Sequence, residues 1–422
     1  MEHKPLKIAL LSVHSSPLGK LGTKDTGGMS IYIREIAGEL GKQGHVVDIY
    51  TRQQHQGDAQ IMRLAENVRL IHLKAGPIDY LPKLDLYPHL HEFFLMMEKF
   101  RVYENKRYDI VQSNYWLSGR VGIWAQIYWR IPHFVLFHTL AAVKNMFPVG
   151  YLEPALRLNV ERLVSKTSTR ILAETERERE QLVTLYDVSA RKISVIPCGV
   201  NGDIFHPLDK QRCRTQLGLD NNQIILLYVG RLDPLKGLEN LICALPHVQQ
   251  HNRLRLLIVG GEIRDYAYIK SLRELAANLE VHKMVTFMGR ADHERLPLYY
   301  SAADALVLPS YTESFGLVGL ESLACGTPVV ATRVGALDKI IHCGTNGFLA
   351  DRPDPYLLAQ QIDRLITALR AGQFFRAAIR RTVMNYCWPQ VAAMMVNEYQ
   401  AAMTHAQFEF CRERKAPVAL SA

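Results

Sequence analysis

Two carboxylates in the second half of the chain, Glu313 and Glu321, are spaced so that both can serve one ligand. Glu313 follows an apolar run over 305–308, and Glu321 lies about two turns farther along the helix that the next residues predict. Carboxylates accept hydrogen bonds from the vicinal hydroxyls of a sugar or a ribose. An alternative interpretation stays open on this segment alone: Glu313 stabilises the helix N-terminus electrostatically and Glu321 is solvated.

A cationic loop supplies a second set of candidates. Residues 230–237 (GRLDPLKG) follow an apolar run, precede a helical pattern, and contain Arg231 and Lys236. Two cations beside a helix N-terminus suit a diphosphate. A solvated loop would have the same composition, so the loop by itself does not decide its role.

Two further loops belong to the first half. Residues 14–30 follow the first apolar run and contain Gly27-Gly28, which lets the backbone approach a ligand where a helix starts. The GxGxxG dinucleotide fingerprint is absent. His138 opens another loop directly after the apolar run 134–137. A histidine at a strand end is more often structural, so His138 gains interest only by sharing a cleft with the other loops.

The hydrophobic pattern predicts the sheets that must bring these loops together. Short apolar runs alternate with amphipathic stretches, which is typical of doubly wound parallel α/β sheets. Ligands of such sheets bind beyond the carboxyl ends of the strands, where all four loops fall. The predicted strands are 6–13, 46–50, 68–73, 109–112, 134–137 and 170–173, then 224–229, 254–259, 285–288, 305–308 and 328–331. The predicted helices are 29–41, 237–249, 293–303, 316–325 and 354–370.

A break in this alternation predicts two domains. Pro and Gly interrupt the pattern at 196–201, and His206-Pro207 ends the interruption, which indicates a linker. We expect an N-terminal domain over 1–200 and a C-terminal domain over 201–387. A chain of 422 residues is long enough for two such domains, each with its own core.

Composition narrows the partners and the compartment. The net charge is +9, but no run of five Lys or Arg occurs, so phosphorylated small molecules or an anionic membrane surface are favoured over nucleic acid. The seven cysteines are scattered without a CxxC pair, which argues against a disulfide framework and a zinc site. The N-terminal apolar run is short for a signal peptide and no apolar stretch of about 18 residues occurs. We expect a cytoplasmic protein.

Taken together, the loops resemble those of glycosyltransferase family 4, retaining enzymes with the GT-B fold. The Glu-x7-Glu segment, followed by Gly326-Thr327-Pro328-Val329, is the specific signature. The inositol-phosphate glycosyltransferases of mycothiol synthesis are especially similar, through GTKDTGGMSIYI (22–33), YWLSG (115–119), HTLAAVKN (138–145), GRLDPLKG and ESFGLV. The stretch LPKLDLYPHLHEF (81–93) is similar to sucrose-phosphate synthase. The resemblance implies two Rossmann-like domains facing across a cleft, with a C-terminal helix near 388–406 returning to the first domain.

The resemblance implies donor and catalytic roles, residue by residue. Gly28 approaches the donor phosphates, Arg231 and Lys236 hold the diphosphate and stabilise the leaving group, and Glu321 binds the ribose. The donor sugar is held by Glu313 and the backbone after it (Ser314, Phe315, Gly316 and Leu317), and His138 lies beside the reacting sugar. The implied catalytic set is His138, Arg231, Lys236 and Glu313. Retention needs no protein nucleophile, because the leaving phosphate deprotonates the acceptor on the same face.

The resemblance also implies an acceptor site. Lys83, Tyr115, Thr139 and Arg157 match the positions that hold the acceptor's phosphate, and His14 and Asp25 match positions that touch its ring. A Lys, an Arg and two hydroxyls make a sound phosphate site. Ser30 stands where the family motif GGMN has Asn, which leaves the identity of the polyol open.

These features predict a retaining hexosyltransferase that uses UDP-glucose or UDP-N-acetylglucosamine and a phosphorylated polyol or sugar. An inositol phosphate is the favoured acceptor, and a hexose phosphate is an alternative. No cofactor is required and no metal ligands are assigned, although bound magnesium stays open, as does a homodimer. Another alternative is a membrane-surface transferase of polysaccharide or glycolipid synthesis, with 151–165 as an amphipathic face; a core-packing helix is the favoured interpretation there. The last alternative is a non-catalytic nucleotide-sugar binder.

Overall fold

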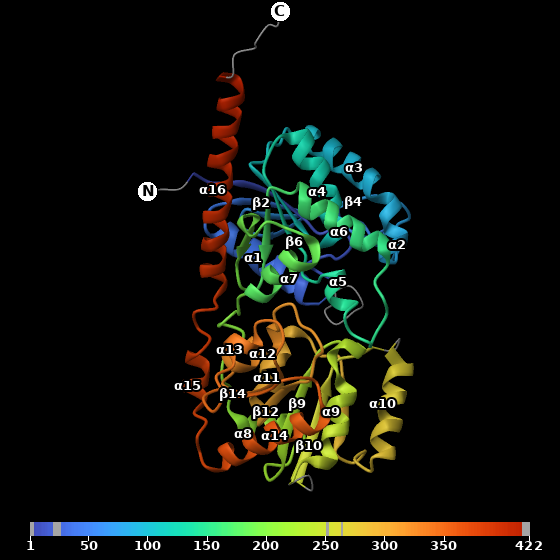
Figure 1. Ribbon diagram of the computed structural model, residues 1–422, viewed down its shortest axis with the longest axis vertical. Helices are drawn as coiled ribbons and strands as arrows, with labels where there is room; N and C mark the ends of the chain where they lie inside the picture. The colour runs from blue at the N-terminus through green and yellow to red at the C-terminus, as the bar shows by residue number, and fades with distance from the viewer. Residues whose placement is uncertain (1–3, 20–26, 250–252, 263–264, 416–422) are drawn as a thin grey trace, which may run out of the picture.

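Two separate β-sheets organise the chain. The computed structural model describes residues 4–19, 27–249, 253–262 and 265–415, with side chains up to residue 404. The first sheet has eight strands in the order β3-β4-β2-β1-β5-β6-β7-β8, and the second has six in the order β11-β10-β9-β12-β13-β14. Among the described strands, only β3 runs antiparallel to its neighbour, β4. The predicted pair of doubly wound α/β domains is therefore confirmed (Figure 1).

The strands of the first sheet are β1 (Lys7–Leu11), β2 (Val46–Arg52), β3 (Ile61–Ala65), β4 (Val68–Leu73), β5 (Ile110–Asn114), β6 (His133–Leu136), β7 (Arg170–Ala173) and β8 (Ile193–Val195). Those of the second sheet are β9 (Ile224–Val229), β10 (Leu254–Val259), β11 (Val285–Gly289), β12 (Ala305–Leu308), β13 (Val329–Thr332) and β14 (Gly347–Ala350).

The helices around the first sheet are α1 (Gly28–Lys42), α2 (Lys83–Leu86), α3 (Leu90–Tyr103), α4 (Tyr115–Trp129), α5 (Ala141–Lys144), α6 (Ala155–Thr167) and α7 (Glu176–Tyr186). Those around the second sheet are α8 (Lys210–Gln216), α9 (Leu238–Ala244), α10 (Tyr266–Asn278), α11 (Leu296–Ala302), α12 (Leu317–Ala324), α13 (Leu337–Ile340), α14 (Pro355–Arg370) and α15 (Arg376–Arg381). The chain ends in α16 (Trp388–Lys415).

Three short strands escaped the sequence prediction, each for its own reason. β3 lies at a sheet edge and most of its residues are exposed, so it lacks a buried apolar stripe. β8 has three residues and runs directly into the linker. β14 is fully buried but begins with Gly347, where an added Cβ would lie 2.0 Å from the carbonyl oxygen of Val329.

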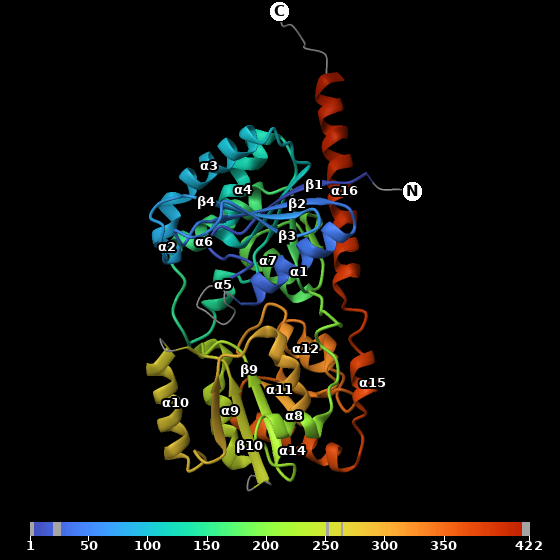
Figure 2. The ribbon, with the colours of Figure 1, turned by 180° about the vertical axis from the view of Figure 1, so that it is seen from behind.

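The last helix, α16, packs on the first sheet although it follows the second in sequence. The Tyr399 hydroxyl donates a hydrogen bond to Gln112 Oε1 on β5, and Tyr32 of α1 contacts Met395 Sδ. Figures 1 and 2 show α16 beside the first domain from both sides. The chain therefore passes between the two sheets twice.

The two connecting segments lie side by side. The backbone N–H of Val200 donates to the carbonyl of Tyr386 at 2.7 Å, and Val200 forms an isolated parallel bridge with Cys387. At Gly199, an added Cβ would come within 2.7 Å of the Trp388 ring, so only glycine fits this approach. The predicted linker and the start of α16 thus form one paired connection.

Candidate active site

The four predicted phosphate-binding residues lie together at the carboxyl edge of the first sheet. The Arg157 guanidinium stacks over the Tyr115 ring, 4.8 Å from its centroid, and Lys83 Nζ lies 5.9 Å from the same centroid. Arg157 Nη2 donates to both the carbonyl and the hydroxyl of Thr139, at 2.7 and 2.9 Å. Residues from α2, α4, α6 and the loop after β6 therefore converge on one cationic cluster.

Carboxylates within the chain compensate Arg157. Its side chain is 2% exposed and pairs with Glu161 at 2.7 Å and with Glu153 at 3.0 Å, each one helical turn away. Burial alone would lower the pKa of Arg157, but Tyr115, Glu161 and Glu153 raise it, so the guanidinium keeps its charge. Burial raises the pKa of Tyr115 to about 12, which keeps its hydroxyl protonated at neutral pH.

The remaining predicted acceptor residues divide into three cases. The His14 ring stacks on Tyr115 with centroids 4.6 Å apart, so His14 belongs to the cluster. Ser30 is fully buried and its Oγ lies 2.8 Å from Ser15 Oγ, which directs this hydroxyl into the protein. Asp25 lies outside the described residues.

The imidazole ring of His138 forms its hydrogen bonds with side chains of the first domain. Nδ1 lies 3.0 Å from Glu174 Oε1 and Nε2 lies 3.0 Å from Asn114 Oδ1, so both ring nitrogens are engaged. The Asn114 amide is oriented because its Nδ2 donates to the Leu11 carbonyl at 3.3 Å. The group of His138 that faces the second domain is its carbonyl, which accepts a hydrogen bond from the Ser314 hydroxyl.

Tyr115 and His138 are two of the non-glycine residues of the first domain that have a positive φ. Tyr115 has φ 77° and His138 has φ 58°, a left-handed region that bulky residues rarely adopt. Tyr115 directly follows β5, and one residue separates His138 from β6. Such conformations cost on the order of 1–3 kcal/mol and persist only where surrounding contacts impose them. Asn67, Asn105, Arg130 and Asp187 of the same domain also have a positive φ, so this conformation is not confined to the candidate site.

Lys236 and Glu313 meet across the cleft-facing edge of the second sheet. Lys236 Nζ lies 2.6 Å from Glu313 Oε2, and Glu313 Oε1 accepts from the Ser310 hydroxyl at 2.7 Å. Arg231 is exposed in the loop after β9, and its carbonyl accepts from the Tyr228 hydroxyl at 2.8 Å. The two predicted donor loops are therefore neighbours.

The N-termini of α1 and α12 approach each other across the domains. Helix α12 begins after Gly316, whose φ of 100° suits glycine, and an added Cβ there would lie 3.0 Å from Leu337. At Gly28, an added Cβ would lie 3.3 Å from Leu317 Cδ1. Glycine at position 28 thus permits the close approach of two helix N-termini, which are favourable for anions.

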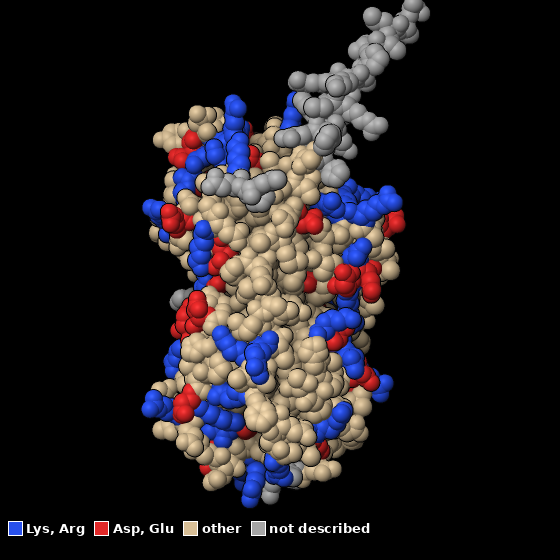
Figure 3. All heavy atoms as spheres, turned by 90° about the vertical axis from the view of Figure 1, so that its left-hand side faces the viewer, with Lys and Arg blue, Asp and Glu red and all other residues tan. Residues whose placement is uncertain are grey.

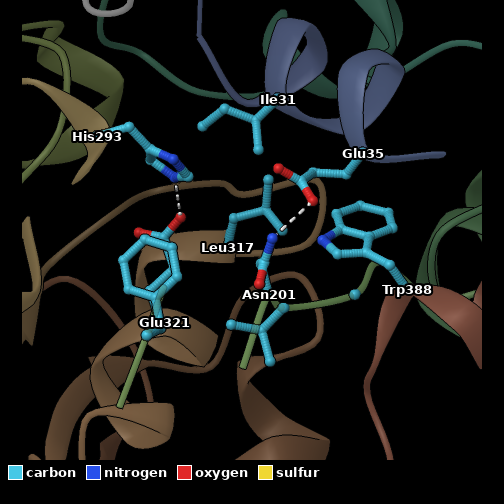
Figure 4. A pocket seen from close by; sticks show the side chains of 10 residues that line it. Ile31, Glu35, Asn201, His293, Leu317, Glu321 and Trp388 are labelled. Atoms are coloured by element: carbon cyan, nitrogen blue, oxygen red, sulfur yellow. Dashed lines mark hydrogen bonds and ion pairs between the residues drawn. The ribbon is translucent and has the colours of Figure 1, made fainter. Parts of the chain in front are cut away.

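Glu321 occupies a pocket between the domains (Figure 4). Its carboxylate lies 3.0 Å from His293 Nε2 and accepts from the Tyr300 hydroxyl at 2.8 Å. Burial lowers the pKa of His293, but the hydrogen bond and charge of Glu321 outweigh it, and the net pKa is raised. The described residues lining this pocket include Glu321 but not Glu313, so the two carboxylates have separate surroundings.

Known proteins similar to this chain identify its family. Residues 27–199 match the family described as "Glycosyl transferase 4-like domain", and 209–372 match "Glycosyl transferases group 1". The D-inositol 3-phosphate glycosyltransferase of Acidothermus cellulolyticus is 38% identical over 94% of this chain and 91% of its own, and that of Corynebacterium glutamicum is 36% identical over 95% and 98%. The chain is a family 4 glycosyltransferase.

Solved structures confirm the GT-B fold of the transferase. Sucrose-phosphate synthase from Thermosynechococcus elongatus is 32% identical, with a TM-score of 0.87 over 95% of this chain and 100% of that one. Anabaena HepE in complex with UDP and glucose has a TM-score of 0.74 at 20% identity, over 94% and 100% of the chains, a likeness of fold alone.

Several polar partners in the site of the transferase were not predicted. Asn114 and Glu174 hold the His138 ring, and His293 holds Glu321. Asn114 ends β5 and Glu174 directly follows β7, the two strands that flank β6, so polar residues at neighbouring strand ends were an available signal. Glu153 and Glu161 lie four residues either side of Arg157, the spacing of helical ion pairs.

The helices and the surface charges bear on two open questions, whether the protein works at a membrane surface and whether it binds a metal ion. Helix α6 buries Val160 and Val164, which confirms a core-packing helix within 151–165. On the face in Figure 3, basic and acidic side chains are interspersed. Across the described part of the chain, no helix is long and apolar enough to cross a membrane. The same residues contain no group of three or more His, Cys, Asp and Glu placed to hold a metal ion.

Proposed function

We propose that this glycosyltransferase moves a sugar from a UDP-sugar, with retention of configuration, to a hydroxyl of a phosphorylated polyol or sugar. An inositol phosphate is the favoured acceptor and a hexose phosphate the alternative. The observation that carries the proposal is the cluster of Lys83, Tyr115, Thr139 and Arg157. Two cations and two hydroxyls in one place suit a phosphate monoester.

The relatives support a phosphorylated acceptor. The names of the D-inositol 3-phosphate glycosyltransferases and of sucrose-phosphate synthase each include a phosphorylated compound. The chain is at least 32% identical to each of these three proteins over most of its length. The Ser30 hydroxyl points toward Ser15, so we propose that the polyol is selected mainly by other residues, among them His14.

We assign the donor to the opposite wall of the cleft. The diphosphate of UDP-glucose or UDP-N-acetylglucosamine would lie between Arg231, Lys236 and the N-termini of α1 and α12. Lys236 would stabilise negative charge that develops on the leaving phosphate, and Glu313 orients its ammonium group through their 2.6 Å ion pair. That phosphate would then take the proton of the attacking acceptor hydroxyl. We assign the donor ribose to Glu321 in its pocket.

A crossed screen tests the proposal. Purified protein is incubated with each of several UDP-sugars and with inositol phosphate, glucose or fructose phosphates, and the corresponding unphosphorylated compounds, and released UDP is measured. We expect turnover only with a phosphorylated acceptor, and an axial anomeric linkage in the product by NMR. UDP release with lipid-linked acceptors but with none of the phosphorylated small molecules would overturn the proposal.

A further inference from the structure

The Arg157 guanidinium is nearly saturated by the protein itself. Its Nε donates to Glu161, its Nη2 donates twice to Thr139, and its Nη1 lies 3.0 Å from Glu153 Oε1. A guanidinium has five N–H groups, so at most one is left for another partner. A phosphate can engage Arg157 in the usual two-bond manner only by replacing one of these partners.

The two carboxylates on Arg157 differ in how firmly they are held. Glu161 is fully buried and also accepts hydrogen bonds from the Ala141 backbone N–H at 3.0 Å and from the Tyr186 hydroxyl. The Glu153 side chain is 16% exposed, and its carboxylate pairs with the Arg157 guanidinium and the Lys144 ammonium, both of them cations. Glu161 is therefore a fixed counter-ion, whereas Glu153 occupies a position that another anion could take.

The backbone at Glu153 permits a movement of the side chain alone. Its N–H donates to Asn145 Oδ1 at 2.7 Å, and its carbonyl accepts from Asn145 Nδ2 at 3.2 Å. The preceding residues, Tyr151 and Leu152, are 94% and 79% exposed, and the Glu153 side chain is itself 16% exposed, so it reaches solvent. Rotation of the Glu153 side chain into solvent thus leaves this pair of backbone bonds intact.

The charges in the cluster fit such an exchange. Lys83, Lys144 and Arg157 supply three positive charges, and Glu153 and Glu161 supply two negative ones. When Glu153 turns away, the excess becomes two positive charges, which matches a phosphate monoester near its second pKa. An uncharged hydroxyl cannot compensate Lys144 and Arg157 in place of the carboxylate.

We propose that Glu153 is a displaceable counter-ion that makes the acceptor site selective for phosphate: the acceptor's phosphate replaces its carboxylate on Lys144 and Arg157. This inference rests on the proposed function, because it assumes an acceptor phosphate in this cluster. Glu153 would then determine specificity by occupying the phosphate position. Removal of its negative charge should therefore strengthen anion binding.

Phosphate binding by the Glu153→Gln variant is the test. Inorganic phosphate is titrated into wild-type protein and variant in a calorimeter, and the apparent melting temperature is followed against phosphate concentration. We expect the dissociation constant of phosphate to fall roughly tenfold in the variant, because the neutral amide competes weakly for two cations. The KM for the phosphorylated acceptor should fall in parallel, and kcat should change less.

Two variants serve as controls. Glu161→Gln removes the fixed counter-ion and should lower the melting temperature, since an amide cannot accept from all three of its partners. It should tighten phosphate binding less than Glu153→Gln, because Glu161 does not occupy the position that the phosphate would take. Glu180→Gln changes the same charge at an exposed position of α7 and should leave phosphate binding unchanged.

The outcomes separate the inference from the proposed function. Phosphate that binds Glu153→Gln no more tightly than wild type, while wild type transfers to a phosphorylated acceptor, would overturn the inference alone. Tighter phosphate binding in the variant, together with a wild-type enzyme that uses only unphosphorylated acceptors, would confirm the displacement and overturn the proposed function.

Discussion

The ion pair between Lys236 and Glu313 is the residue-scale feature most directly tied to the proposed chemistry. Since Lys236 would stabilise charge that appears on the leaving phosphate, we expect Lys236→Ala to lower kcat by about 100-fold or more. Steady-state kinetics of UDP release provide the measurement. Lys210→Ala is the matched control, because Lys210 also forms a 2.6 Å ion pair with a carboxylate, Asp304, in the same domain. Equal activities of the two variants would argue against a role of Lys236 in the reaction.

A second prediction concerns Glu178, whose carboxylate accepts a hydrogen bond from the backbone N–H of Glu174, the partner of His138. Burial, and then the charge of Glu174, raise the pKa of Glu178 to about 8 from its ordinary 4.5. The folded state therefore holds a proton that the unfolded state releases, so this contribution to the free energy of unfolding declines between about pH 4.5 and pH 8. Glu178→Gln removes the titration, and we expect it to gain stability relative to wild type by up to about 1.4 kcal/mol per pH unit in that window.

Urea denaturation at pH 5, 6, 7 and 8 checks this expectation for Glu178. Glu176→Gln on the same helix is the control, because the Glu176 side chain is 62% exposed. A stability difference between wild type and Glu178→Gln that is constant with pH would show that Glu178 is ionised in the folded protein.

The role of His138 shows the limit of prediction at the residue scale. Its position after a strand and near the cleft was predictable from the sequence. Its ring contacts were not, because Asn114 and Glu174 lie 24 and 36 residues away and meet it only through the strand order β5-β6-β7. The implied role beside the reacting sugar stays a prediction, and the carbonyl, rather than the imidazole, is the group that faces the second domain.

At the level of secondary structure, one prediction concerns the donor diphosphate between the helices that begin at Gly28 and Leu317. An added Cβ at Gly28 meets Leu317 at 3.3 Å, so Gly28→Val should separate the two helix N-termini and weaken binding of the donor diphosphate. We expect a KM for the donor raised by roughly tenfold, measured by UDP release.

Gly38→Ala on the same helix is the control for Gly28→Val. An added Cβ at Gly38 meets nothing within 4 Å, so this change should leave KM unaltered and stabilise α1 by about 0.5–1 kcal/mol. An unchanged donor KM in Gly28→Val would mean that the diphosphate does not lie between these helices.

The elements themselves were largely predictable because most strands are apolar runs that end in loops rich in Gly or polar residues. The central strands β1, β5, β6, β9 and β12, which position the candidate site, all fall within or beside predicted strands. The edge strands β3, β8 and β14 were missed: β3 is mostly exposed, β8 has only three residues, and β14 begins with a glycine that follows a polar loop. The functional loops were found because they follow central strands.

At the scale of the whole molecule, the Ser314 hydroxyl and the His138 carbonyl join the donor loop to the first domain. Ser314→Ala removes a hydrogen bond worth about 1 kcal/mol, which should shift the equilibrium toward an open arrangement of the domains by about fivefold. Small-angle scattering of the protein should then give a larger radius of gyration. Ser271→Ala is the control, because the Ser271 hydroxyl donates to the Tyr268 carbonyl within α10. An equal change in both variants would contradict the prediction.

The two-domain design was predictable from the sequence, whereas the way the domains meet was not. The domain boundary near residue 200 stays a prediction. All strands of the first sheet precede it, and all strands of the second sheet follow it. Contacts such as Arg34 with His293 and Arg177 with the Arg333 carbonyl join residues more than 150 positions apart. No local pattern encodes such pairs, because they depend on the relative orientation of the two sheets, whose side chains share one continuous hydrophobic cluster.

The paired connection at Val200 and Cys387 has a mechanical consequence. A single tether would let the domains swivel about any axis, but two hydrogen-bonded segments form a ribbon that is thin in one direction and wide in the other. Such a ribbon bends more readily across its thin dimension than within its own plane. Arg380 anchors one side of it to the second domain through the carbonyls of Gly202 and Phe205. The domains should therefore open and close mainly by bending across the thin dimension of this connection, which favours the return of the donor loop to the acceptor cluster.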